Sequence, residues 1–560
     1  MSRTNKLFAV LVIFVLIISI FLTGCGKEEP QQSEESGNPG ALEQPMEKIL
    51  RSSASDPPNI DPGVGSDYVS SIALCNLYDT LVFPEHDGST SPHIATDWTS
   101  EDDGLTWIFN LQQGVKFHNG DELTAEDVVF SVERLKTMGE GYGYLFTDVI
   151  GTVEALDDYK VKFTLTKPFG PFLNTLVRVY IVNAAEVMAH KEDGPYGEMG
   201  DYGKSWLTMN DAGSGPYMVK EMKKQEHLLA VKFPDYWEGW DPDAPETIQV
   251  IGTTSAATVR TLMTNYQLEI SDQWQTEEAL KALGQIPGIE INSAFVGSIL
   301  NIMLNTQKAP TDDIHFRKAL SYIFDYQTVT DKLFPGCKQA FGPVPFNLPG
   351  HKDDIFQYTY NLEKAKEELA QSKYADKLDE YPIDITWIAE VPDEEKIALL
   401  LQANAAQIGI KVNVQKVPWL TFVDEVSTVE NTPHASIVFV SPHYSEAGSI
   451  LESRYHSKST GTWEQAEWLQ DAEIDAAISE AIATVDPAER YKKYEAIQEK
   501  LVELAPTIWV FDQAEKRAYQ SAYVDWPGAR LNAEGKPVSA VMGYNFYFHD
   551  YKVFPENMPK

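Results

Sequence analysis

The sequence predicts an α/β protein with several lobes, from alternating apolar residues, helical spacing and strand–helix–strand order. Apolar and polar residues alternate over 107–111 and over 161–165, as in half-buried strands. Between these segments Thr124 precedes Asp127 as in an N-terminal cap, and apolar residues then recur at helical spacing. A chain of 560 residues with 43% hydrophobic residues exceeds one core, which predicts about two to four domains.

A strand–helix–strand unit is predicted farther along the chain. Residues 383–387 alternate, a helical stretch follows to Gln407, and Gly409 leads into a second strand at 410–414. This order implies parallel pairing. Near the C-terminus, Asp486 followed by Pro487 predicts a helix start.

The first 25 residues predict export. Arg3 and Lys6 precede an apolar run over 7–22, which is shorter than the roughly 20 residues that span a bilayer. A basic start, an apolar core and small residues are typical of a signal peptide. Cys25 directly after Thr-Gly looks like a bacterial lipobox, which implies a lipid on Cys25. A single-span membrane protein is the alternative.

Residues 25–47 read as a disordered tether, because they are polar and contain little to bury. As a flexible chain they would reach roughly 25 Å. This segment would act as a flexible tether between a membrane and the folded part of the chain.

The net charge and the number of cysteines further narrow the possible classes of protein. A net charge of -38 disfavours binding to nucleic acid and to anionic lipid headgroups. Besides Cys25 there are only Cys75 and Cys337, which is no disulfide framework. We expect two buried free thiols. A disulfide between Cys75 and Cys337 is the alternative.

Catalytic, nucleotide and metal signatures are missing from the sequence. There is no His-Glu-x-x-His and no Gly-x-Ser-x-Gly. The 203–205 segment (GKS) resembles the end of a phosphate loop, but the required first glycine is Glu198. None of the 11 histidines pairs at metal-ligand spacing. We therefore expect no enzyme, no cofactor and no metal.

From about residue 50 to its end, the chain resembles the substrate-binding proteins that serve peptide and nickel ABC importers, family 5 of the solute-binding proteins. Several blocks carry the resemblance in order, and the block over 114–128 is the most specific. The blocks are 56–62 (DPPNIDP), 76–81 (NLYDTL), 114–121 (GVKFHNGD), 123–128 (LTAEDV), 213–217 (GSGPY), 235–237 (DYW), 316–320 (FRKAL) with Asp325, 473–475 (EID) and 486–490 (DPAER).

The resemblance implies a fold like that of type II periplasmic binding proteins, with two lobes on a hinge and an inserted third domain. Its implied bounds are 1–24 for the signal peptide, 48–76, 214–304 and 516–560 for lobe I, 77–213 for the inserted domain, and 305–515 for lobe II. It also implies an extracytoplasmic monomer that closes over an oligopeptide or an oligosaccharide and passes it to ABC permease subunits.

The chain departs from the family at two places. Peptide-binding members hold the α-ammonium with an Asp in lobe II, and Tyr444 stands at that position with Glu446 as the nearest carboxylate. Glu446 or Asp56 would then have to replace it, because a buried ammonium needs a paired charge. A Gly-x-x-Asp pattern is replaced by Tyr266 to Glu269.

The expected site is aromatic and neutral-polar, which suits sugar rings as well as peptide side chains. For each aromatic, core packing is the alternative to ligand contact. The predicted ligand-binding residues are Asp56, Tyr142, Tyr144, Trp274, Asn301, Trp419, His443, Tyr444, Glu446 and Trp463. Two other functions stay open: a secreted hydrolase or lyase on a binding-protein-like scaffold, and a sensor lipoprotein without an importer.

Overall fold

The computed structural model describes residues 47–559. The predicted signal peptide, Cys25 and all but the last residue of the tether lie outside this range. The described residues fall within one compact unit, and the predicted bounds of its lobes stay predictions. No helix among the described residues is long and apolar enough to cross a membrane.

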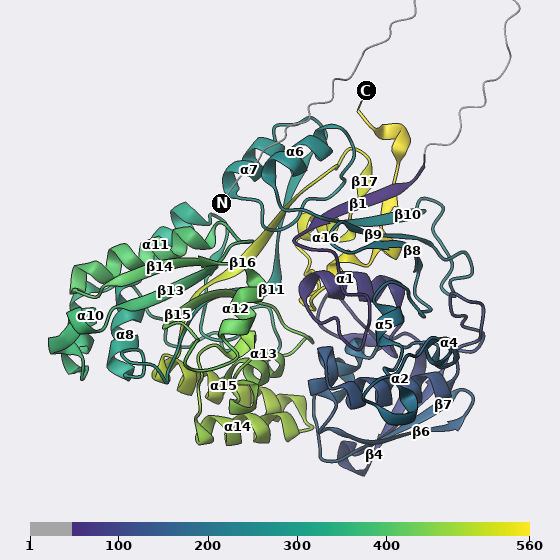
Figure 1. The fold of residues 1–560 in the computed structure, drawn as a ribbon, viewed down its shortest axis with the longest axis horizontal. Helices are drawn as coiled ribbons and strands as arrows, with labels where there is room; N and C mark the ends of the chain where they lie inside the picture. Colours follow the sequence, from purple (N-terminus) through teal and green to yellow (C-terminus); the bar gives the residue numbers. More distant parts are fainter. Residues whose placement is uncertain (1–46, 560) are drawn as a thin grey trace, which may run out of the picture. The chain divides into compact units, whose positions relative to one another are not determined.

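The first lobe is built on a mixed four-stranded sheet in the order β1-β10-β9-β8 (Figure 1). β1 and β10 are parallel, and the other neighbours are antiparallel. The strands are β1 (Ile49–Ala54), β8 (Tyr217–Lys223), β9 (His227–Lys232) and β10 (Thr247–Gly252), and the helices are α1 (Tyr68–Leu77), α6 (Ala256–Thr264) and α7 (Glu277–Leu283).

The inserted domain carries an antiparallel sheet in the order β4-β5-β7-β6. The predicted alternating segments are β5 and β7, which pair directly. The predicted cap is present, because Thr124 N–H donates to Asp127 at 2.9 Å. Its elements are β2 (Val82–Pro84), β3 (Thr90–Pro92), β4 (Ala95–Glu101), β5 (Thr106–Leu111), β6 (Ile150–Asp157), β7 (Lys160–Leu165), α2 (Ala125–Met138), α3 (Phe172–Thr175), α4 (Ala184–Ala189) and α5 (Lys204–Leu207).

The second lobe contains a six-stranded sheet in the order β12-β16-β11-β15-β13-β14. β13 is parallel to both β14 and β15, so the predicted parallel unit is confirmed. The second strand starts at Val412 and not at residue 410, because Ile410 N–H still bonds back to Ala405 O. The shorter strands are β12 (Lys338–Gln339), β13 (Ile383–Ile388), β14 (Val412–Val417) and β15 (Ala435–Val440).

Helices pack on this sheet. The predicted start of α15 is confirmed: Asp486 accepts from Glu489 N–H at 2.8 Å, and Pro487 is the first helical residue. The helices are α8 (Ile314–Ile323), α9 (Tyr326–Thr328), α10 (Leu362–Gln371), α11 (Glu394–Ala405), α12 (Trp419–Glu425), α13 (Ala447–Tyr455), α14 (Ala472–Ala483) and α15 (Pro487–Leu504).

Two long antiparallel strands run from one lobe into the other, β11 (Glu290–Leu304) and β16 (Thr507–Tyr519) (Figure 1). At the first-lobe end, Tyr519 bridges Ile270, which in turn bridges Ser52 of β1. The chain closes with β17 (Val524–Asp525), α16 (Pro527–Ala533) and β18 (Lys552–Val553). β11 and β16 therefore join the two lobes, where the resemblance implies a hinge.

Both described cysteines are free thiols, as expected. Cys75 is buried in α1, whereas Cys337 is only half-buried. Burial raises the pKa of the Cys75 thiol to about 12, so this thiol stays protonated and inert.

Candidate ligand-binding site

Three parallel strands of the second lobe end at the same edge of their sheet. β13 is followed by Glu390, β14 by Trp419 and β15 by His443. In open α/β sheets, ligands bind outside the carboxyl ends of the strands. This edge is therefore where a ligand is expected.

The first lobe presents the matching edge of its own sheet. Asp56 follows β1, and Trp274 follows Ile270, which lies parallel to β1. Ser53 donates to Asp272 at 3.1 Å and fixes the two segments side by side. Asp56 and Trp274 thus lie at the carboxyl edge of the mixed sheet.

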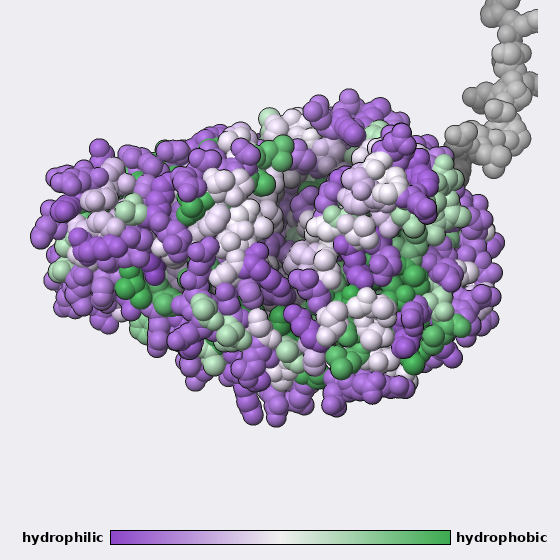
Figure 2. Space-filling model, turned by 60° about the horizontal axis from the view of Figure 1, so that its bottom comes forward, coloured by the Kyte–Doolittle hydropathy of each residue, from purple (hydrophilic) through white to green (hydrophobic). Residues whose placement is uncertain are grey.

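The two edges face each other across a cleft. The rings of Trp274 and Phe439, one from each lobe, are 5.3 Å apart. Partial burial raises the pKa of Asp56, and the nearby negative charges of Glu390 and Asp67 raise it further. The space-filling view shows a hollow between the two halves of this face of the molecule (Figure 2).

Two indoles cover one wall of the cleft. The rings of Trp419 and Trp463 meet edge to face with centroids 5.2 Å apart, and both side chains are half-buried. Trp419 N–H donates to Glu390 at 3.0 Å. A carboxylate and two aromatic rings are therefore adjacent, an arrangement that suits an organic cation.

The inserted domain reaches the same site through Tyr144, which is partly exposed, while the buried Tyr142 packs beneath it. The Tyr142 ring lies 5.5 Å from the His443 ring, and the Tyr144 hydroxyl contacts Nδ1 of His443. Nε2 of His443 lies 2.9 Å from Glu464, and although burial opposes it, His443 lowers the pKa of that carboxyl. Nε2 of His443 thus faces Glu464 and Nδ1 faces the Tyr144 hydroxyl, so the imidazole bridges the second lobe and the inserted domain.

Arg178 anchors the loop that carries His443 from the interior of the protein. It is fully buried, and it donates from Nε to His443 O at 2.6 Å and from Nη2 to Met542 O at 2.9 Å. Its guanidinium lies 4.7 Å from the centroid of the Tyr142 ring. Arg178 therefore ties the inserted domain to the loop that carries His443.

Four predicted ligand residues are fully buried in the interior: Glu446, Tyr444, Asn301 and Tyr142. Glu446 is fully buried, accepts from Arg490 at 2.7 and 2.8 Å and from the Tyr494 hydroxyl at 2.7 Å. Its carboxylate is therefore occupied and enclosed. Tyr444 and Asn301 are also fully buried, Asn301 within β11. Tyr142 is enclosed as well, and its hydroxyl bonds to the Ser71 hydroxyl at 2.6 Å. The resemblance places Tyr444 at the position of the family's Asp, with Glu446 as the nearest carboxylate in the sequence, and Asn301 is expected there as a hydrogen-bonding group.

Sequence reasoning missed Glu390, Glu464 and Arg178. Glu390 had a signal, because it follows an alternating strand as Trp419 follows the next one. Glu464 and Arg178 had none, since their role rests on contacts far apart in the sequence.

The second departure from the family pattern, Tyr266 to Glu269, has a structural explanation. Tyr266, where the pattern has Gly, adopts φ 54°, a left-handed conformation that glycine tolerates best. Glu269, where the pattern has Asp, is fully buried and pairs with Arg51 at 2.9 Å. The replaced pattern is thus part of the scaffold.

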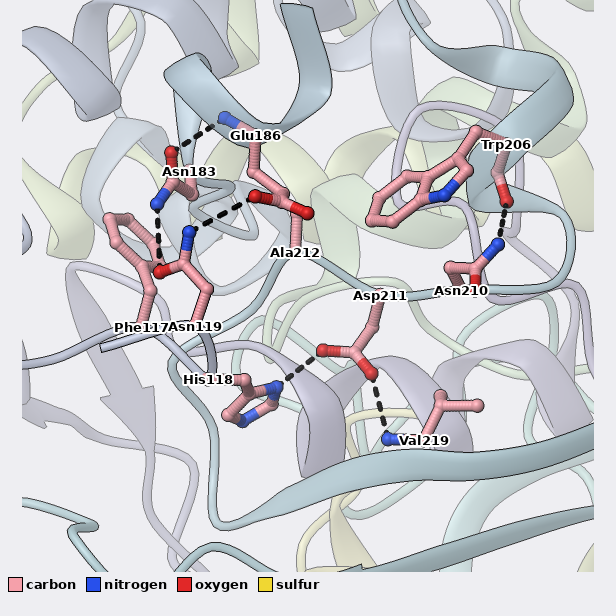
Figure 3. Close-up of a pocket in the computed structure, with 10 residues that line it drawn as sticks. All are labelled: Phe117, His118, Asn119, Asn183, Glu186, Trp206, Asn210, Asp211, Ala212 and Val219. Carbon is pink, nitrogen blue, oxygen red and sulfur yellow. Dashed lines mark hydrogen bonds and ion pairs between the residues drawn. The ribbon is translucent and has the colours of Figure 1, made fainter. Parts of the chain in front are cut away.

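The most specific block of the resemblance lines a different cavity, in and beside the inserted domain (Figure 3). His118 contacts Asp211, and its Nε2 lies 2.9 Å from Gly215 O. Asn183 donates to Asp121 at 2.9 Å. The cavity measures about 130 Å³, and the polar groups around it bond mainly to one another. The block therefore joins the inserted domain to the first lobe.

Metal ligation has no candidate among residues 47–559, since these contain no group of three or more His, Cys, Asp or Glu placed to hold an ion.

Comparisons with known proteins agree on one family. The sequence description of the bacterial extracellular solute-binding proteins, family 5, matches residues 89–462. A relative from Escherichia coli, "Probable D,D-dipeptide-binding periplasmic protein DdpA", is 28% identical over 84% of this chain and 89% of its own length.

Solved structures share the fold while holding different ligands. The ABC transporter-associated periplasmic binding protein DppA from Helicobacter pylori, in complex with peptide STSA, has a TM-score of 0.77 and 22% identity, covering 90% of this chain and 98% of its own. NikZ from Campylobacter jejuni, in complex with Ni(L-His), has a TM-score of 0.77 and 19% identity, covering 90% and 99%. The shared fold does not determine which ligand is bound.

Proposed function

Because this chain belongs to the bacterial extracellular solute-binding proteins of family 5, we propose that it is the lipid-anchored, peptide-binding component of an ABC importer. The two lobes close over the peptide about β11 and β16, and permease subunits recognise the closed form. Cys25 carries the lipid, and the protein acts as a monomer without catalysis.

One observation carries the peptide assignment: Glu390 of the second lobe lies close enough to Asp56 of the first lobe for its charge to raise the pKa of Asp56. A desolvated ammonium requires paired negative charge. Glu446 is already engaged by Arg490, whereas Asp56 accepts no hydrogen bond from any described residue. The charge of Glu390 raises the pKa of Asp56, and a cation bound between the two carboxylates would relieve this repulsion. We therefore place the peptide α-ammonium between Asp56 and Glu390, beside Trp419.

Relatives support transport of small peptides. The Helicobacter pylori protein is associated with an ABC transporter, and its structure holds a peptide. The Escherichia coli relative is described as a dipeptide-binding periplasmic protein. An oligosaccharide is the second candidate, because the Trp419 and Trp463 rings would also stack on sugar rings.

Thermal-shift titration separates the candidates after mass spectrometry of ligand carried through purification. Peptides with a free amino terminus should stabilise the protein, by about 2.7 kcal/mol at 100 times Kd. The same peptides acetylated at the amino terminus should raise the melting temperature of the protein far less. Equal shifts for both would overturn the ammonium assignment, and a shift with oligosaccharides alone would replace peptide by sugar.

Two further measurements test the remaining parts. Cys25→Ser should move the protein from the membrane fraction to the soluble fraction. Peptide incubated with the purified protein should be recovered intact, because we propose binding without turnover. Cleaved peptide would instead support the hydrolase alternative.

A further inference from the structure

A small cavity lies on the cleft at the crossing strand β16, with walls from both lobes. The first lobe contributes Trp274 and Gln275, and the second contributes Val391 and Phe439. Phe511 of β16 lines it as well. The walls are mainly aromatic and apolar, and the cavity measures about 40 Å³.

Two polar atoms in this lining accept no hydrogen bond from any described residue, Oε1 of Gln275 and Oδ1 of Asp393. Asp393 is offset by an ion pair with Lys396 at 2.9 Å, whereas Gln275 has no such partner. Gln275 is 5% exposed, and its Oε1 accepts no hydrogen bond from any described residue. Its Nε2 donates to Thr254 O at 2.9 Å and to Asp272 at 2.8 Å, so the amide is held in place. A buried acceptor without a partner is unfavourable until a donor reaches it.

The wall that carries Gln275 is rigid. Asp272 is fully buried and accepts from Gln275, from Trp274 N–H at 2.9 Å and from the Ser53 hydroxyl. One carboxylate thus orients both Trp274 and Gln275. Lys516, which also lines the cavity, is paired with Glu277 at 2.5 Å and leaves no free cation there.

We infer that this cavity receives one short side chain of the bound peptide that carries a hydroxyl, as serine and threonine do, with Gln275 as its acceptor. The inference rests on the proposed peptide ligand. The volume matches roughly three water-sized spaces, enough for two or three heavy atoms and too little for an aromatic ring. The apolar walls favour the threonine methyl group, and Gln275 Oε1 accepts from the hydroxyl.

The geometry also assigns roles to the walls. Gln275 selects a hydroxyl over a methyl group of equal size, so threonine should be preferred to valine. Trp274 and Val391 limit the size of the side chain. These residues determine specificity at one peptide position and leave the α-ammonium contacts unchanged.

Isothermal titration with tripeptides of the form Ala-X-Ala, X-Ala-Ala and Ala-Ala-X tests the inference, with X as threonine, valine or phenylalanine. At one position, threonine should bind at least about 10-fold more tightly than valine. Phenylalanine should bind more weakly still. Gln275→Leu should abolish the preference for threonine, whereas Gln371→Leu, on an exposed face of α10, should keep it.

A second pair of variants tests size without touching Gln275. Val391→Phe should fill the cavity and weaken binding of the threonine peptide more than that of its glycine counterpart. Trp274→Ala should admit phenylalanine. Peptides that bind with no position preferring threonine over valine would overturn this inference alone. Binding of none of the peptides would overturn the proposed function and this inference with it.

Discussion

Trp419 donates its backbone N–H to Oε2 of Glu390 over 3.0 Å, and this bond joins the residues that follow β14 and β13. Glu390 thereby has two roles: it fixes the backbone at Trp419, and its negative charge raises the pKa of the nearby Asp56. Substitutions can separate these roles, because an amide oxygen also accepts a hydrogen bond.

Glu390→Gln should keep the bond to Trp419 and remove only the charge. We expect peptide affinity at pH 7 to fall by 10-fold or more, with the free energy of unfolding changed by less than about 1 kcal/mol. Calorimetric titration and urea unfolding measure the two quantities. Glu390→Ala, which removes the bond as well, is the comparison, and unchanged affinity in both variants would contradict the charge assignment.

Trp419→Ala should reduce the thermal shift produced by peptide and leave the protein folded. The side chain is only half-buried, so its loss exposes little core. Trp206→Ala is a matched control, because Trp206 is also half-buried but stacks on His190 in the inserted domain, at 4.4 Å. If the two variants respond to peptide alike, Trp419 does not contact the ligand.

Glu446→Ala should destabilise the protein without weakening binding. It would leave the guanidinium of Arg490 buried without its partner, which costs about 3–5 kcal/mol. Urea unfolding would show the loss, while titration of the remaining folded protein should return an unchanged Kd. A large change in Kd with little loss of stability would return Glu446 to the binding site.

Asp512 predicts a pH dependence of stability. It lies 2% exposed on β16, one oxygen has no partner among the described residues, and burial raises its pKa to about 7. Lys338 and the Phe346 N–H oppose this shift only in part. A carboxyl whose pKa is raised on folding binds its proton more tightly in the folded state. Stability should therefore fall as pH rises from about 4 to about 7.

Asp512→Asn isolates this effect, because it keeps the shape and cannot ionise. At pH 8 the variant should be more stable than the wild type by a few kcal/mol, and near pH 4 the difference should largely vanish. Urea unfolding at both pH values measures it. The same stability difference at both pH values would show that Asp512 does not titrate in this range.

The local elements could be predicted from the sequence because their signals are local. Alternation over 107–111, 161–165 and 383–387 gives each strand one apolar face, which packs on a core. This signal does not depend on which other segments form that core. The caps at Thr124 and Asp486 bond within three residues. Trp419, Trp463 and His443 stay predicted site residues; the resemblance indicates Trp419, and the polar loop around it indicates Trp463.

The choice between carboxylates was decided by the tertiary structure. Glu446 and Glu390 both follow strands of one sheet, and nothing within a few residues of either tells them apart. Arg490, 44 residues away on α15, encloses Glu446, while the parallel order of β13 with β14 and β15 leaves Glu390 on the cleft. Burial and partner depend on contacts between segments far apart in the chain, and residue order alone does not encode these as a readable pattern.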